Sequence, residues 1–254
     1  MSKFIYCWED YRKLYRLAKS RIVSRENYFA FEKEQGILLI KYLKSKKVPL
    51  SQKRLLDLGC GLGGYPIAFQ EEGAQVVGVD LERGRIPGFH GKVTADALTV
   101  PFSEGSFDLV ICASLIEHVS QPEVLIQEAL RVLRPGGFLF LSYPPFYSPV
   151  GGHQFAPFHL LGERISTYVF RKRNKFKKLV WLNERMSMSP ASYAASFGSW
   201  GLYRMTIRKT RQMMRQLPFD ILDCSTRLLP INTAVIPILG EFLTWHVQFL
   251  ARKI

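Results

Sequence analysis

The sequence of 254 residues predicts a doubly wound α/β fold built around one parallel sheet. Short apolar segments that are typical of strands alternate with segments of helical length, and such alternation requires right-handed crossovers between parallel strands. A glycine-rich turn follows the first of these strands, and an acidic residue ends the second. These observations favour a Rossmann-like core that binds its ligand at the carboxyl ends of the strands.

The predicted elements follow one another in a regular order after an N-terminal helical segment over residues 1–49. Strands are expected at Arg54–Leu58, Ala74–Val79, Lys92–Ala95, Phe107–Cys112, Phe138–Ser142 and Phe219–Ser225. Helices are expected at Glu26–Lys46, Tyr65–Glu72, Pro122–Leu133 and Leu202–Leu217. We therefore expect a core over residues 50–142, a basic lid over 143–217 inserted after the fifth strand, and C-terminal strands and a helix over 218–254 that complete the core.

Positive charge is concentrated in two parts of the chain, whose formal net charge is +14. Residues 1–50 hold 12 Lys and Arg against 5 Asp and Glu, and residues 164–215 hold 13 against 1. The second imbalance favours an anionic partner over an ordinary solvated helix face. Arg171–Lys178 and Arg208–Arg211 are the candidate contacts, and an anionic lipid, a phosphate-bearing substrate or RNA would fit them.

The cysteines and the two ends of the chain bear on its compartment. Four widely spaced cysteines without a Cys-x-x-Cys pair indicate neither a disulfide framework nor a cysteine-rich zinc site, so a reducing cytoplasm is expected. Glu9 and Asp10 interrupt the first apolar run, which excludes a signal peptide there. The apolar run Val235–Lys253 fits either a helix or strand packed on the domain, which is the favoured interpretation, or an interfacial helix through Phe242, Trp245 and Phe249 that holds the protein at a membrane surface.

The strongest local motif is Asp57-Leu-Gly-Cys-Gly-Leu-Gly-Gly64 at the end of the first predicted strand. Glycines at this point let the backbone approach a ligand at the head of a helix. The motif is ambiguous by itself, because Gly59, Gly61 and Gly64 also satisfy the Gly-x-Gly-x-x-Gly pattern of dinucleotide-binding proteins. Asp80, at the end of the second strand, can bind ribose hydroxyls in either case.

The segments around this motif resemble the class I S-adenosylmethionine-dependent methyltransferase family, in the large methyltransferase type 11-like group with Asp-x-Gly-x-Gly-x-Gly. The resemblance covers residues 54–142 and continues through four further signatures: Ala95–Leu98, Pro101–Asp108, Ile116–Val119 and Leu133–Gly137. It implies a mostly parallel seven-stranded sheet with helices on both faces and an antiparallel last strand, sought near Ile231–Val235. It also implies that S-adenosylmethionine is the cofactor, that S-adenosylhomocysteine is the product and that no metal is needed.

The resemblance assigns ten residues to the donor pocket. They are Asp57, Gly59, Gly61, Gly63, Asp80, Leu81, Asp96, Ala97, Ser114 and Leu115. The three glycines would line the pocket, Asp57 would lie near the methionine amino end, and Asp80 would bind the ribose hydroxyls. Leu81 would pack on the adenine, Asp96 and Ala97 would sit by its amino group, and Ser114 and Leu115 would line the methionine side. Leu81 as a core residue and Asp96 as a turn residue are the alternatives.

Two histidines are the candidate catalytic residues. A sulfonium methyl is already activated, so the protein must mainly hold an acceptor in line and exclude water, and a base is needed only for a poor nucleophile. His118 follows the fourth strand and is the first candidate base, and His153 follows the fifth. Either histidine can instead only shape its loop. A metal pair of His153 with His159 is disfavoured, because no carboxylate cluster completes such a site.

These features favour a methyltransferase that acts on a small-molecule or a lipid- or glycan-linked anionic acceptor, at an oxygen atom. An RNA methyltransferase that grips its substrate with the basic block 164–215 is the first alternative, although no RNA-binding module is recognisable. A nicotinamide-dependent (NAD) oxidoreductase is the second, and a catalytically silent protein that keeps the donor pocket is the third. The expected location is the cytoplasm, with the basic and C-terminal segments available for contact with a membrane surface.

Overall fold

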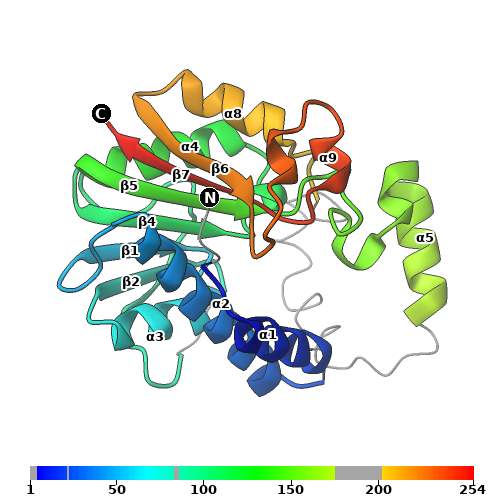
Figure 1. The fold of residues 1–254 in the computed structure, drawn as a ribbon, viewed down its shortest axis with the longest axis horizontal. Coiled ribbons are helices and arrows are strands. Elements are labelled where there is room, and N and C mark those ends of the chain that lie inside the picture. Colours follow the sequence, from blue (N-terminus) through cyan, green and yellow to red (C-terminus); the bar gives the residue numbers. More distant parts are fainter. Residues whose placement is uncertain (1–4, 22, 83–85, 175–201) are drawn as a thin grey trace. The chain divides into compact units, whose positions relative to one another are not determined.

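The computed structural model describes residues 5–21, 23–82, 86–174 and 202–254 (Figure 1). The chain divides into two compact units. Unit 1 consists of Met1–Cys112, Glu128–Phe140 and Arg252–Ile254, and unit 2 consists of Ala113–Gln127 and Leu141–Ala251. Residues 175–201, which belong to the predicted lid and to the basic block, lie outside the described residues.

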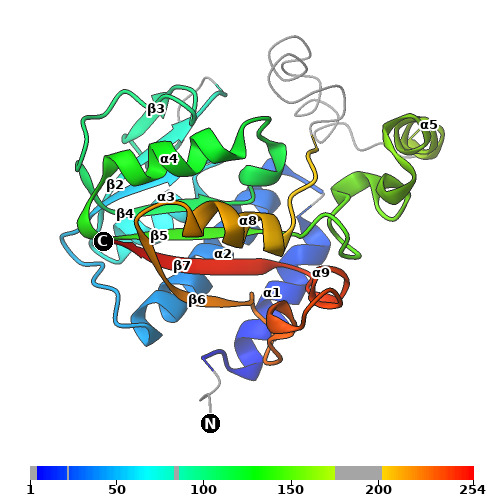
Figure 2. The ribbon, with the colours of Figure 1, turned by 90° about the horizontal axis from the view of Figure 1, so that it is seen from above.

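Seven strands form one sheet, as the sequence predicts. They are β1 (Arg54–Leu58), β2 (Gln75–Asp80), β3 (Lys92–Thr94), β4 (Phe107–Ala113), β5 (Leu133–Tyr143), β6 (Phe219–Thr226) and β7 (Val247–Lys253). Their order is β3-β2-β1-β4-β5-β7-β6 (Figure 2). β1 pairs in parallel with β2 and with β4, and β2 pairs in parallel with β3. The doubly wound α/β architecture is confirmed.

The last strand runs opposite to β6, as the resemblance implied, but it lies later in the chain than expected. The backbone N–H of Arg227, directly after β6, donates to the carbonyl of His246, directly before β7, at 2.8 Å. The end of β6 therefore lies beside the start of β7, which requires antiparallel strands (Figure 1). Residues 231–235, where the strand was sought, instead include the 3₁₀ turn η4 (Thr233–Val235).

Unit 1 begins with two helices, α1 (Trp8–Ser20) and α2 (Arg25–Ser45), where the sequence predicts only the second in detail. Ser24 caps α2, because its side chain accepts a hydrogen bond from the Asn27 backbone at 3.2 Å. An ion pair of 2.6 Å between Lys41 and Asp10 joins the two helices. The buried face of α2 includes Leu38, Leu39, Ile40, Tyr42 and Leu43. The core of unit 1 therefore includes this helix as well as the sheet.

The glycine turn leads into α3 (Gly64–Glu71), and α4 (Pro122–Val132) leads directly into β5. The sequence predicts a strand that begins at Phe138, but the strand already begins at Leu133. Arg134 is held there by Asp108, with 3.2 Å between the guanidinium and the carboxylate. Proline and glycine end the helix as expected, and the chain pairs into the sheet without an intervening loop.

Unit 2 contains α8 (Ile207–Arg215), which begins five residues later than predicted from Leu202. Thr206 is the N-cap, and its side chain accepts a hydrogen bond from the backbone of Lys209 at 3.0 Å. The preceding residues are tied to other segments instead, because the Phe146 backbone N–H donates to Met205 O at 2.8 Å. The remaining elements of the unit are η1 (Ile116–His118), η2 (His153–Phe155), η3 (Phe158–Leu161), α5 (Glu163–Asn174) and α9 (Gly240–Leu243).

The apolar C-terminal run is a short helix followed by a strand, so it does not form one interfacial helix. Phe249 is fully buried in β7, whereas Phe242 and Trp245 are 47% and 56% exposed. The favoured interpretation, a segment packed on the domain, is confirmed for Val247–Lys253. In the described part of the chain, no helix combines the length and the apolar character that crossing a bilayer requires.

Candidate functional site

The glycine turn after β1 adopts the backbone geometry for which the motif was singled out. Gly59, Gly61 and Gly63 have φ values of +75°, +52° and +88°, all in the left-handed region. Gly63 also has no room for a side chain, because a Cβ there would lie 2.5 Å from Cγ2 of Ile86. Both the backbone conformation and the space therefore require glycine at position 63.

Asp80 lies at the end of β2 and holds this turn in place. Its Oδ2 accepts a hydrogen bond from the Gly61 N–H at 2.8 Å, and its Oδ1 accepts one from the Glu82 N–H at 2.8 Å. The register pairs Leu58 with Val79, so the turn and the aspartate lie at the same edge of the sheet. The predicted location of Asp80 is confirmed, and its role toward a ribose stays a prediction.

Asp57 is the least expected part of this edge, because it is an acidic side chain that is only 2% exposed. Among the described residues, its Oδ2 has no hydrogen-bond partner. Burial raises the pKa of Asp57 well above its usual range, and the nearby carboxylates of Glu32 and Asp80 raise this pKa further. Glu32 belongs to α2. The sequence offered no signal for its proximity, because α2 lies outside the methyltransferase-like motifs.

These residues fit the methyl donor that the resemblance implies. S-adenosylmethionine carries an ammonium group and a sulfonium, and a buried, unpaired carboxylate beside two further acidic groups favours a cation. Leu81 is 44% exposed and is therefore accessible to an adenine ring. Asp96 follows β3 and is exposed, but its Oδ1 accepts a hydrogen bond from the Leu98 N–H at 2.9 Å, so the turn role is confirmed. The neighbouring Ala97 is buried.

Ser114 and Leu115 follow β4 and belong to unit 2. Ser114 has a left-handed φ of +56°, and its N–H donates to the carbonyl of Ser142 at 2.7 Å. Its hydroxyl lies 3.3 Å from Nε2 of His246. Burial lowers the pKa of His246 well below its usual range, and Arg227 lowers it further, so His246 is neutral at pH 7. Sequence reasoning missed His246, because it lies in the apolar C-terminal run.

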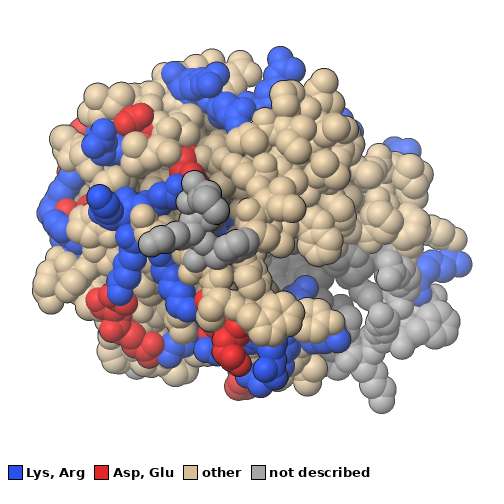
Figure 3. All heavy atoms as spheres, viewed as in Figure 1, with Lys and Arg blue, Asp and Glu red and all other residues tan. Residues whose placement is uncertain are grey.

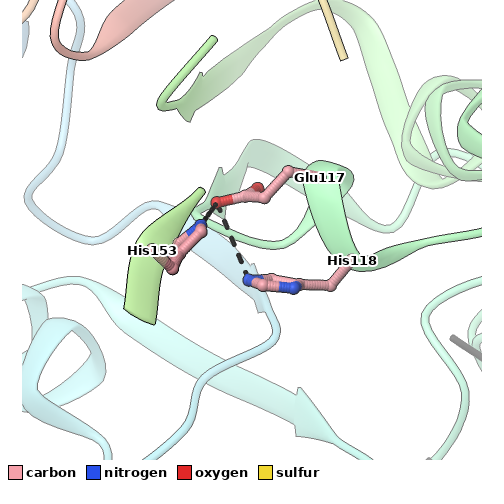
Figure 4. A group of neighbouring side chains, drawn as sticks. All are labelled: Glu117, His118 and His153. Carbon is pink, nitrogen blue, oxygen red and sulfur yellow. Dashed lines mark ion pairs between the residues drawn. The ribbon is translucent and has the colours of Figure 1, made fainter. Parts of the chain in front are cut away.

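Both predicted catalytic histidines lie in unit 2 beside one carboxylate (Figure 4). Glu117 and His118 come from η1, and His153 is the first residue of η2. Oε1 of Glu117 lies 3.4 Å from Nε2 of His153 and 3.9 Å from Nε2 of His118. The centroids of the two imidazole rings are 4.9 Å apart. The structure therefore brings the two predicted histidines together, and it adds Glu117, which the sequence analysis noted only as part of a family signature.

His159 does not join this group. Its side chain is buried, and Nε2 hydrogen-bonds the carbonyl of Phe146 at 2.7 Å while the ring packs on the Phe146 ring. His159 therefore packs within its loop. The partner that the structure places beside His153 is Glu117, not His159.

Part of the basic block is already paired inside unit 2. On α8, Lys209 lies 3.3 Å from Glu123, and Arg211 lies 3.3 Å from the sulfur of Cys224. Arg208 and Arg215 are exposed, and basic side chains gather over α8 in Figure 3. Residues 175–178 of the predicted run Arg171–Lys178 lie outside the described residues. An anionic partner therefore stays a prediction.

Comparisons with known proteins point to one family. A family model described as a methyltransferase domain matches residues 56–141. An uncharacterized methyltransferase of Mycolicibacterium gilvum is 39% identical over 116 residues, which are 42% of this chain and 46% of that protein. Another, from Mycobacterium leprae, is 31% identical over 169 residues, or 62% of this chain and 63% of that protein. The chain thus matches less than two thirds of the length of each of these curated relatives.

A solved structure shares the fold. An S-adenosylmethionine-dependent methyltransferase from Mesorhizobium loti superposes with a TM-score of 0.53 at 20% identity, covering 84% of this chain and 96% of that one. The strand order supports the same assignment, because the antiparallel β7 lies between β5 and β6. The dinucleotide-binding fold has the order 3-2-1-4-5-6 instead. The oxidoreductase alternative is therefore disfavoured by the sheet itself.

Proposed function

We propose that this chain, whose residues 56–141 form a methyltransferase domain of the class I family, transfers a methyl group from S-adenosylmethionine to a hydroxyl of a small-molecule or lipid- or glycan-linked acceptor. The observation that carries the proposal is the buried carboxylate of Asp57 beside Glu32 and Asp80. These acidic groups favour the ammonium of the donor. They would repel the pyrophosphate of a nicotinamide dinucleotide, which in dinucleotide-binding proteins sits at the same glycine turn.

The residues of the chain then have separable tasks. The bound donor supplies a methyl group that is activated by the sulfonium. Asp57 neutralises the donor's ammonium, and the turn admits the donor because Gly59, Gly61 and Gly63 have no side chains. A hydroxyl acceptor is a poor nucleophile at neutral pH, so its proton must be taken up as the methyl group is transferred. His153 or His118 accepts that proton, and Glu117 orients the two imidazole rings.

A lipid-linked acceptor is supported by the surface of unit 2. Nine large apolar side chains between residues 229 and 245 are more than one third exposed: Leu229, Ile231, Val235, Ile236, Ile238, Leu239, Phe242, Leu243 and Trp245. The surface over η4 and α9 shows no charged side chains in Figure 3. Exposed apolar side chains that gather in one stretch of chain are typical of a site that meets lipid or another apolar partner.

The donor site is tested first, by thermal unfolding of the purified protein with S-adenosylmethionine, S-adenosylhomocysteine or NADH. We expect the first two to raise the melting temperature, since a ligand at 100 times its Kd adds about 2.7 kcal/mol of stability. Asp80→Ala should lose this shift, whereas the control Glu104→Ala, at an exposed position of the same unit, should keep it. A shift with NADH alone would overturn the proposal.

The acceptor class is tested by incubating the protein with methyl-labelled S-adenosylmethionine and, separately, with lipid, small-molecule and RNA fractions of the source organism. We expect the label in the lipid or the small-molecule fraction, in an ether or ester linkage. Label in RNA would instead support the nucleic acid alternative and contradict the proposed acceptor. His153→Asn serves as the background, because asparagine tolerates the left-handed backbone at this position, where φ is +48°.

A further inference from the structure

The group of Glu117, His118 and His153 has properties that a pair of catalytic histidines does not require. Glu117 is 1% exposed, and within the described residues neither of its carboxylate oxygens has a hydrogen-bond partner. An imidazole nitrogen of His153 and one of His118 lie 3.4 and 3.9 Å from its Oε1. Both separations exceed the 2.7–3.2 Å typical of a hydrogen bond from N–H to oxygen. A buried carboxylate left in this state is costly unless a further positive charge completes its surroundings.

The geometry points to a metal ion. We propose that Glu117, His118 and His153 bind one divalent first-row transition-metal ion, with Zn²⁺ as the expected occupant. Each residue offers one ligand atom, and these three atoms lie within 4.8 Å of one another. Two ligand atoms that are each about 2.1 Å from a tetrahedral zinc ion lie about 3.4 Å apart. The separation of 3.4 Å between Glu117 and His153 already matches this value, and the other two require a modest contraction.

The ligand types decide between classes of metal. Two imidazoles with one carboxylate suit zinc, iron, cobalt or nickel, whereas magnesium and calcium prefer ligand sets made of oxygen atoms. Three protein ligands also leave at least one coordination position open, as in catalytic rather than structural zinc sites. The side chains of His118 and His153 are 22% and 27% exposed, so an ion can reach the group from solvent.

The backbone supports the same arrangement. His153 has a φ of +48°, a conformation that a residue with a side chain rarely adopts. This unfavourable backbone conformation occurs at His153, whose ring lies closer to Glu117 than the ring of His118 does (Figure 4). On the other side of the group, the backbone carbonyl of Glu117 accepts a hydrogen bond from the N–H of Tyr203 at 2.8 Å, which fixes η1.

A bound ion would also have a chemical use. With the ion bound, His118 and His153 would be ligands in place of proton acceptors, and an acceptor hydroxyl at the open position would release its proton to water more readily, because the ion stabilises the alkoxide. This use rests on the proposed methyl transfer to oxygen. Binding of the ion does not rest on it, because the three ligands all belong to unit 2 and none of them is among the residues assigned to the donor pocket.

The test is calorimetric titration of the full chain, after treatment with a chelator, with Zn²⁺, Co²⁺ and Mg²⁺ in separate experiments. We expect one equivalent of Zn²⁺ and one of Co²⁺ to bind, with visible absorption bands for bound Co²⁺ that indicate nitrogen and oxygen ligands in a site of low coordination number. We expect no binding of Mg²⁺. Folded wild-type protein that binds no Zn²⁺ at millimolar concentration would overturn the proposal.

Three variants locate the ion. Glu117→Gln and His153→Asn should each weaken Zn²⁺ binding by at least about tenfold, because each removes one of three protein ligands. His90→Asn changes an exposed histidine of unit 1 and should leave the affinity unchanged. Unfolding temperature and S-adenosylmethionine binding, measured on the same samples, show that each variant is folded. Zn²⁺ affinity that is unchanged in Glu117→Gln and His153→Asn, or lost in His90→Asn, would overturn the site. Failure of S-adenosylmethionine binding in the wild type would instead count against the proposed function alone.

Discussion

Asp57 in unit 1 and Glu117 in unit 2 are both buried and have carboxylate oxygens without a hydrogen-bond partner among the described residues, and the two differ in what surrounds them. Asp57 in unit 1 lies near two further acids, Glu32 and Asp80. Glu117 in unit 2 faces the imidazole rings of His118 and His153. The two buried carboxylates are therefore expected to bind different kinds of cation. Acidic neighbours favour an organic cation, whereas imidazole neighbours favour a metal ion that they share with the carboxylate.

This contrast matters because burial alone would not separate the two sites. Both side chains are at most 2% exposed. The difference lies in the neighbouring side chains. Those near Asp57 are acidic and add negative charge. Those near Glu117 are imidazoles, whose nitrogen atoms carry lone pairs that can bind a metal ion. Variants that remove one carboxylate at a time should therefore change the affinity for different ligands. Measuring both affinities in each variant tests the contrast between the two sites directly.

The largest effect is expected for Glu117→Gln. If the imidazole group takes up the acceptor proton, loss of this carboxylate should lower kcat for methyl transfer by about 10²–10⁴-fold. The Kd of S-adenosylmethionine should stay within twofold, because Glu117 is not a residue of the donor pocket. Steady-state kinetics and calorimetry on one preparation measure both. A rise in the Kd of the donor with an unchanged kcat would contradict the division of tasks between the two carboxylates.

The next effect concerns the glycine turn after β1. Gly63→Ala should destabilise the protein by about 2–4 kcal/mol, because a side chain is disfavoured at its left-handed backbone and would collide with Ile86. Gly105→Ala is a matched control, since Gly105 also has a positive φ, of +64°, but a Cβ there meets nothing within 4 Å. Only the conformational cost of about 1–2 kcal/mol is expected for it. Chemical denaturation measures both, and equal losses would show that the contact with Ile86 does not matter.

A smaller effect is expected on donor affinity from Asp57→Asn. The variant removes the charge but keeps the shape of the side chain, and the S-adenosylmethionine Kd should rise by about 10–100-fold, the value of a hydrogen bond to a charged group. Zn²⁺ affinity should not change. An unaltered Kd for the donor would show that Asp57 does not meet the donor's ammonium, and the contrast between the two carboxylates would then lose its basis in unit 1.

The smallest effect is on stability without ligand, and it has a defined direction with pH. The pKa of Asp57 is raised in the folded state above 3.8, so the folded protein holds this proton more tightly than the unfolded chain. The contribution of Asp57 to stability is therefore present at low pH and is lost as pH rises from 3.8 through the folded-state pKa. Asp57→Asn should be more stable than wild type at pH 7, by about 1–2 kcal/mol, and should lack this slope. Urea unfolding at several pH values gives the slope, and a variant less stable than wild type would contradict the direction.

Much of unit 1 could be predicted from the sequence, because its signals are local. The glycine turn, the strand before it and Asp80 at the next strand end are each recognisable from a few neighbouring residues, and the structure places them at one edge of the sheet. Parallel strands bring their carboxyl ends together whatever the details of packing. The alternation of strands and helices likewise determined the doubly wound architecture, whose physical cause is the pairing of parallel strands through crossovers.

Other features depended on contacts between segments that lie far apart in the chain. Local spacing predicts a helix from Leu202, but the first residues are bonded to other segments, as in the hydrogen bond from Phe146 N–H to Met205 O, and the helix begins only at Ile207. The last strand was sought near Ile231, but it forms at Val247–Lys253, where five successive residues from Val247 to Ala251 are buried and the strand lies between two neighbouring strands.

The fold class, the glycine turn and the acidic residue that holds it could be recognised in the sequence alone, because they follow from short-range patterns. Only the tertiary structure decided that Glu32 approaches Asp57 and that Glu117 lies between two histidines, His118 and His153. Charges and imidazole rings carry no periodic signal, and thirty-five positions separate His118 from His153. The proximity of such groups is set by how the loops after β4 and β5 pack, and packing is a property of the whole fold and not of any one segment.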